Sequence, residues 1–161
     1  MSKHNSLPAF LERLDPNIFL GDNYVVLDFE TDTSHGDYGA PVHLDNHLLL
    51  ACWKVGPNGI VRSKWGSEFE QGELLVAIGN ADFIVAHNAK YELGWLKRCG
   101  VDLRKVLAYD TKMGEYVLLG NLAAGDEVMP RKQTSLDMCC RRRGLPVKDP
   151  VVDELIKSGI N

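Results

Sequence analysis

Several features that mark common protein classes are missing from this 161-residue sequence. No apolar run approaches the about 20 residues of a membrane-spanning helix, and the N-terminus lacks the long apolar core of a secretory signal. The four cysteines form no C-x-x-C pair, which disfavours a zinc ribbon or a thioredoxin-type motif. We therefore predict a soluble protein of a reducing cytoplasm, with its thiols free and no membrane partner.

An excess of basic charge is also missing. The chain has 18 Lys and Arg against 22 Asp and Glu, a net charge of −4, so it is not a polycation that coats nucleic acid. A nucleic-acid partner would have to be held by local basic patches or by metal ions. No Walker A, G-x-G-x-x-G or G-x-S-x-G motif occurs, so neither a nucleotide cofactor nor a serine hydrolase is supported.

What is present fits an ordinary globular domain, with 45% hydrophobic and 25% charged residues. Residues 1–23 read as an N-terminal leader with a short helix over 7–14, and 24–161 as the domain. Turn residues and apolar periodicity predict strands over 24–30, 47–55, 60–65, 81–86 and 106–109, and helices over 68–78, 88–100, 111–119, 135–143 and 151–157. Hairpinned strands followed by alternating strands and helices predict an α/β fold, a mixed sheet flanked by helices.

Two acidic residues stand out on the first predicted strand. Because strand side chains alternate, Asp28 and Glu30 project from the same face of this strand, whose other residues are mostly Val, Leu and Phe. Neighbouring carboxylates repel each other, and a divalent cation with oxygen ligands would relieve that repulsion. The alternative is a solvated strand end whose acids have no role.

A third acid follows a later strand. On a helix beginning at Asn88, Glu92 shares one face with Leu96 and Cys99, which is not the usual placement of a solvated acid. Asn88 has two interpretations: it contributes to a functional site, or it only caps the helix.

Four ordered segments together resemble a known family. They are VLDFET at 26–31, AHNAKYE at 86–92, YDTKMGEYVLL at 109–119 and TSLDMCC at 134–140. In this order they are similar to the exonuclease motifs of the DEDD superfamily, most closely to the 3′–5′ proofreading domain of family A DNA polymerases, especially those of phages. The resemblance spans about residues 24–145.

The resemblance implies an RNase H-like fold, with three antiparallel strands followed by parallel ones, and a 3′–5′ exonuclease that hydrolyses DNA with two Mg²⁺ or Mn²⁺ ions. The implied partners are a single-stranded DNA 3′ end and a DNA polymerase domain or subunit, in a bacterium or phage-infected cell. Carried over by position, the catalytic metal ligands are Asp28, Glu30 and Glu92, and the residues contacting the terminal nucleotide are Thr31, Asn88 and Tyr91.

The sequence departs from the family pattern at two points, and these departures suggest alternatives to an active exonuclease. Glu92 stands where the family has Asp, and its extra methylene moves the carboxylate by about a bond length, which matters for Mg²⁺ geometry. The third motif, a Tyr or His before an Asp, does not occur, so we expect a fragment truncated before that motif, with the fourth ligand beyond Asn161. The alternative function is a catalytically incomplete module that binds nucleic acid or docks a polymerase. A third is an RNA-processing exonuclease.

Other polar and aromatic residues receive simpler interpretations. The basic runs at 97–98 and 141–143 are candidates for guiding a DNA strand, but solvated helix faces are the favoured interpretation. Asp110 is expected to form hydrogen bonds near the site rather than bind metal. The three tryptophans are expected to pack in the core or on the surface rather than stack on bases.

Overall fold

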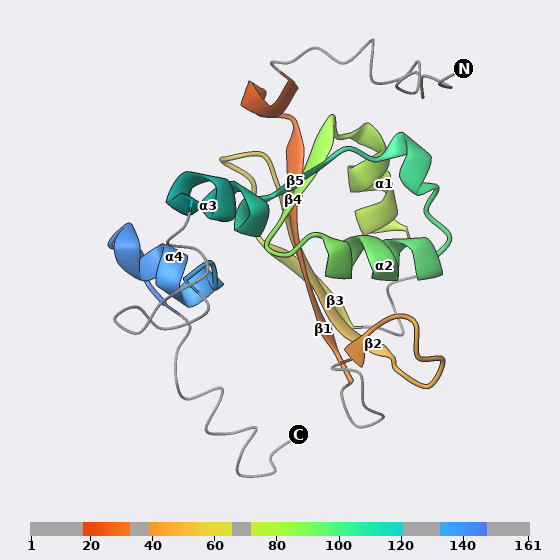
Figure 1. Ribbon diagram of the computed structural model, residues 1–161. Coiled ribbons are helices and arrows are strands. Elements are labelled where there is room, and N and C mark those ends of the chain that lie inside the picture. Colours follow the sequence, from red (N-terminus) through yellow and green to blue (C-terminus); the bar gives the residue numbers. More distant parts are fainter. Residues whose placement is uncertain (1–17, 33–38, 66–71, 121–132, 148–161) are drawn as a thin grey trace, which may run out of the picture. The chain divides into compact units, whose positions relative to one another are not determined.

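The computed structural model describes residues 18–32, 39–65, 72–120 and 133–147. The chain forms two compact units, Met1–Tyr109 and Asp110–Asn161. The helices expected over 7–14 and 151–157 lie outside the described residues. The first unit is built on a five-stranded sheet in the order β3-β2-β1-β4-β5 (Figure 1). Its strands are β1 Tyr24–Thr31, β2 Leu48–Val55, β3 Arg62–Trp65, β4 Phe83–Ala86 and β5 Ala108–Asp110.

The sheet is mixed and its central strand is β1. β1 pairs antiparallel with β2, and β2 pairs antiparallel with β3. On its other side β1 pairs parallel with β4. All five predicted strands are found, within about two residues of the expected ends, and the α/β class with a mixed sheet is confirmed.

Two helices cover one face of this sheet: α1, Glu73–Asn80, and α2, Lys90–Arg98 (Figure 1). Alternate residues of β1 point into the core beneath them and are at most 5% exposed. Burying this apolar surface is the main favourable term in folding. The buried core cluster comprises Val25, Leu27, Phe29, Ala51, Trp53, Leu74, Ile78, Ile84, Trp95 and Leu96.

The start of α2 differs from the prediction. Asn88 is not the N-cap: that position is Ala89, and no side chain caps the helix. Asn88 instead adopts a left-handed φ of 76°, which asparagine tolerates better than most residues, and its carbonyl accepts a hydrogen bond from the Tyr91 amide at 2.9 Å. The helix ends at Arg98, close to the predicted end, and Gly100, φ 88°, lies just beyond it.

Arg98 at the end of α2 is exposed, as the favoured interpretation expects, and it also makes contacts within the chain. Its guanidinium donates to the carbonyls of His43 and Leu44 at 2.9 and 2.7 Å, and it lies 5.0 Å from the centre of the Trp95 ring. The loop at 39–46 is thereby fastened to α2. Asn46 adds a hydrogen bond inside the loop, from its fully buried side chain to the Ala40 carbonyl.

The second unit contains α3, Thr111–Leu119, and α4, Leu136–Arg142. Asp110 caps α3 by accepting hydrogen bonds from the amides of Lys112 and Met113. The prediction that Asp110 forms hydrogen bonds is confirmed at the start of this helix. Short 3-10 turns at Ile18–Leu20 and Leu103–Lys105 complete the first unit. No helix in the described part of the chain is long and apolar enough to cross a membrane.

The basic run at 141–143 is also engaged within the second unit. Arg142 and Arg143 both donate to the Glu115 carboxylate, Arg142 at 2.8 Å. Arg142 also donates to the Gln133 carbonyl at 2.7 Å. Arg142 and Arg143 remain exposed, as the favoured interpretation of a solvated helix face expects, but both also bind a buried acid 27 and 28 residues away.

Candidate functional site

The paired acids lie on the face of the sheet opposite the core. Asp28 and Glu30 are exposed, while Leu27 and Phe29, which alternate with them, are 2% and 5% exposed. The strand alternation that buries the apolar residues therefore turns both carboxylates the other way. We call this surface the carboxylate face; it consists of Val26, Asp28 and Glu30 of β1, Leu50, Cys52 and Lys54 of β2, and Ser63 and Trp65 of β3.

Strand register fixes which residues accompany each acid. Asp28 lies opposite Cys52, and the burial of that thiol, followed by the negative charges of Asp28 and Glu30, raises its pKa. Both carboxylates therefore act on the same neighbour, and the alternation of β1 places them on one face. A site with this negative potential favours a cation.

Glu30 begins a second row across the sheet. It lies opposite Leu50, and Leu50 lies opposite Trp65. The Trp65 side chain is 65% exposed, whereas Trp53 and Trp95 are core residues as predicted. Sequence analysis did not single out Trp65 as a site residue; the hairpin turn at 56–59 was the signal, because it sets the register that places Trp65 in the row of Glu30, one strand beyond Leu50.

Two of the predicted nucleotide contacts are joined by a hydrogen bond. The Thr31 hydroxyl contacts the Tyr91 hydroxyl, which also donates to the Gly39 carbonyl at 3.2 Å. A Cβ at Gly39 would lie 2.0 Å from the Thr31 hydroxyl oxygen, so only glycine permits this approach. The end of β1, the loop at 39–46 and the first turn of α2 are thus held together beside Glu30.

Glu92 and Asn88 are placed differently from the acid pair. Glu92 lies in the first turn of α2, where the helix dipole favours a negative charge, but it is only 3% exposed and shares its buried face with Leu96. The predicted common face of these two residues is confirmed. Asn88 is exposed in the turn before the helix.

The structure therefore brings together the acid pair, and separately Thr31 with Tyr91. Among the described residues, no group of three or more His, Cys, Asp or Glu side chains is arranged to hold a metal ion. The chemistry of the pair nevertheless fits a hard divalent cation, because Asp28 and Glu30 offer exposed carboxylate oxygens from one face. Glu92 fits such a site only if its buried carboxylate turns toward the pair.

Comparison with known proteins adds no family. No protein-family model matches the chain, and no curated protein sequence matches it.

Proposed function

We propose that this chain is a DEDD-type 3′–5′ exonuclease module with an RNase H-like sheet, which hydrolyses the terminal phosphodiester of single-stranded DNA. The observation that carries the proposal is the pair Asp28 and Glu30, exposed side by side on the central strand of a mixed sheet. The neighbouring strand β4 runs parallel to β1 and leads into the helix that bears Glu92. A two-metal phosphodiesterase needs acids that converge on ions about 3.5–4 Å apart, and a strand and a following helix can supply such acids when their side chains turn to one point.

Each residue has a distinct role in this proposal. Asp28 and Glu30 would hold divalent cations, Mg²⁺ or Mn²⁺, and Glu92 would be the third ligand once its buried carboxylate turns toward the pair. When bound, such ions lower the pKa of a water and stabilise the leaving oxygen. The pair contributes the negative charge that retains the ions where the 3′-terminal phosphate approaches.

The surroundings of the pair would position the DNA strand. The Thr31 and Tyr91 hydroxyls lie at the end of β1 and offer polar contacts to the terminal nucleotide, with Asn88 at the adjacent turn. The exposed ring of Trp65, in the same row as Glu30, offers a surface on which a base can stack. Trp65→Ala should therefore weaken DNA binding while leaving the acid pair in place.

A second candidate is favoured by the burial of Glu92. Glu92 is only 3% exposed, whereas the carboxylates of Asp28 and Glu30 are accessible to solvent. A catalytically incomplete module, which binds nucleic acid or docks on a polymerase without cleaving, would have this property. Under this alternative, strand binding persists and hydrolysis does not occur.

The deciding experiment is digestion of 5′-labelled single-stranded DNA with Mg²⁺, Mn²⁺ or EDTA, beside an RNA of the same sequence. We expect a ladder that shortens from the 3′ end, is abolished by EDTA and by Asp28→Asn or Glu30→Gln, and persists in Asp82→Asn. Asp82 is a matched control because it is an exposed acid of the same unit. Binding without cleavage would support the incomplete module, and faster digestion of RNA would change the substrate class. If the chain neither binds nor cleaves the DNA, both candidates are refuted.

A further inference from the structure

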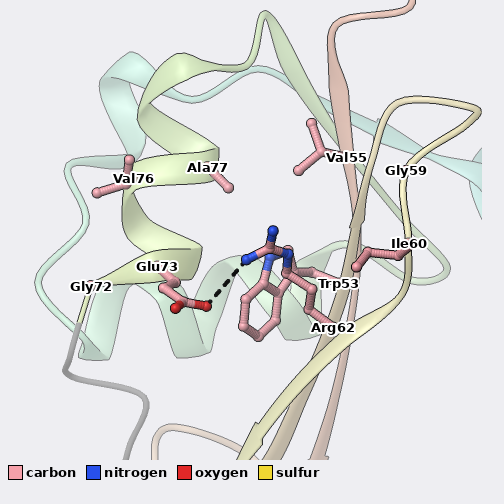
Figure 2. Close-up of a pocket in the computed structure, with 9 residues that line it drawn as sticks. All are labelled: Trp53, Val55, Gly59, Ile60, Arg62, Gly72, Glu73, Val76 and Ala77. Atoms are coloured by element: carbon pink, nitrogen blue, oxygen red, sulfur yellow. Dashed lines mark hydrogen bonds and ion pairs between the residues drawn. The ribbon is translucent and has the colours of Figure 1, made fainter.

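A groove lies on the opposite side of the sheet from the acid pair. It runs between α1 and the hairpin formed by β2 and β3, and its volume is about 690 Å³ (Figure 2). Its floor is Trp53, which is 4% exposed. Because Trp53 and Cys52 are neighbours on β2, their side chains point to opposite faces. We call this surface the hairpin groove; it is separate from the carboxylate face.

The rim of the hairpin groove carries exposed apolar side chains beside the charged residues Arg62 and Glu73. Ile60, Val76 and Val55 line it and are 73%, 62% and 43% exposed. Three neighbouring aliphatic side chains around a hollow are more than the isolated apolar residues of an ordinary surface. A bulky apolar side chain entering the groove would cover them and contact the Trp53 ring.

The strand beside the groove is an edge strand. β3 is the first strand of the sheet order, and in the described part of the chain it pairs only with β2. An edge strand presents backbone N–H and C=O groups on its outer side, and an extended peptide can add to them as a further strand. Alternate side chains of such a strand would point toward α1, over the hairpin groove.

The positive charges of β3 determine which kind of peptide strand can pair with its outer edge. Arg62 and Lys64 lie opposite Trp53 and Ala51, on the groove side of the sheet. Arg62 also faces Glu73 at 3.5 Å (Figure 2), but both side chains are more than half exposed, so this ion pair is weak and exchangeable.

A second copy of the chain is a poor match for this edge. Antiparallel pairing centred on Ser63 would set Arg62 of each chain opposite Lys64 of the other, and pairing centred on Lys64 would set that residue opposite itself. Like charges directly opposite one another are unfavourable in a sheet, and opposite charges are favourable. The complement of this edge is therefore an acidic strand.

We propose that β3 and the hairpin groove bind an extended acidic segment of a partner protein, which adds to the sheet as a sixth strand. Acidic side chains at alternate positions of that segment lie opposite Arg62 and Lys64. Two residues further along, an apolar side chain enters the groove between Ile60 and Val76. This interaction does not depend on nuclease activity, because none of these residues belongs to the acid pair or its face.

The test uses capped, fluorescein-labelled heptapeptides, Thr-Glu-Thr-Glu-Thr-Phe-Thr and its reverse order, to allow both strand directions. Fluorescence polarisation should show saturable binding to the full chain by at least one of them. Replacing both Glu by Lys, or Phe by Thr, should weaken binding at least tenfold. Amide resonances of β3 should shift on titration, whereas those of α3 should not.

Variants of the chain give the decisive comparison. Arg62→Glu with Lys64→Glu should lose the acidic peptide and gain the lysine peptide, an exchange that damage to the fold cannot produce. Lys105→Glu, at an exposed lysine elsewhere, should retain wild-type preference. Val76→Glu should weaken binding at least tenfold, while Val117→Glu, at a 75% exposed valine of α3, should not.

Three results would overturn the proposal. The first is that neither acidic peptide binds at millimolar concentration. The second is equal binding of acidic and basic peptides, which would show that the charges of β3 do not select the segment. The third is concentration-dependent dimerisation in analytical ultracentrifugation that Arg62→Glu abolishes, because the edge would then serve a second copy.

Discussion

The two faces of β1 are built from alternate residues of one strand and have opposite properties. On the core face, Val25, Leu27 and Phe29 are 0%, 2% and 5% exposed and pack beneath α1 and α2. On the other face, Asp28 and Glu30 are exposed and lie against a thiol whose pKa they help to raise. The apolar residues fix the strand and its register, and the position of the acids follows from that register.

This comparison separates residues that hold the site from residues that would act in it. A change on the core face should lower stability, and a change on the carboxylate face should alter chemistry with little loss of stability.

The largest effect is expected from Asp28→Asn. If the proposed function is correct, losing this ligand should lower the hydrolysis rate by about 10³-fold, or about 4 kcal/mol of transition-state stabilisation. The melting temperature should stay the same or rise, because one of two neighbouring like charges is removed. Rate and thermal melting should be measured on the same preparation. A large drop in melting temperature would show that Asp28 holds the fold rather than the site.

Leu27→Ala, one residue away, should have the converse effect. Leu27 is 2% exposed, and truncating a buried leucine costs about 2–5 kcal/mol of unfolding free energy. Urea titration followed by circular dichroism measures this loss. The control is Val26→Ala on the other face, where a 39% exposed side chain should cost much less. Equal losses at the two positions would contradict the assignment of faces.

Much of this arrangement follows from local sequence pattern. The helix at 111–119 is found with the predicted bounds; Asp110 caps its first turn, and a single interior glycine, Gly114, does not end it. The first two strands follow from β-rich runs bounded by turn residues. Alternation along the first strand was sufficient to place Asp28 and Glu30 on one face.

What the pattern did not predict depends on contacts between distant residues. The arginines at 142 and 143 were assigned to solvent because nothing near them in sequence indicates that Glu115 lies against them. Asn88 looked like a cap because both a cap and a left-handed turn favour asparagine. The burial of Glu92 depends on how α2 packs on the sheet, which residue spacing alone does not determine.

Glu115, a buried acid of the second unit, stabilises the fold, in contrast to Asp28 and Glu30, which are proposed to bind metal ions. Hydrogen bonds from Arg143 and Arg142 hold the pKa of Glu115 below its usual value of 4.5. Glu115→Gln should therefore lower the unfolding free energy at neutral pH by about 1–3 kcal/mol, because one of the two guanidinium groups loses its acceptor oxygen and both lose the negative charge.

The pH dependence of this difference has a definite sign. A carboxyl whose pKa is lower in the folded state stabilises the fold above its unfolded pKa, and this contribution is lost as pH falls through the folded pKa. The gap between wild type and Glu115→Gln should be constant above about pH 5.5 and shrink below about pH 4.5. Melting curves across this range measure it, with Asp137→Asn as an exposed control on α4. A gap that widens in acid would contradict the assigned ion pairs.

The smallest expected effect is at Cys52, which reports on the carboxylate face without requiring any activity. Burial is the main cause of its raised pKa, and the charges of Asp28 and Glu30 add to it. Asp28→Asn should therefore lower the pKa of this thiol only partway toward its ordinary value, and alkylation at pH 8 in EDTA should become modestly faster, because the thiolate is the reactive form. Mass spectrometry of the Cys52 peptide measures the rate, and Asp82→Asn should leave it unchanged. An unchanged rate in Asp28→Asn would mean that this carboxylate does not act on Cys52, and the register that places both on one face would have to be revised.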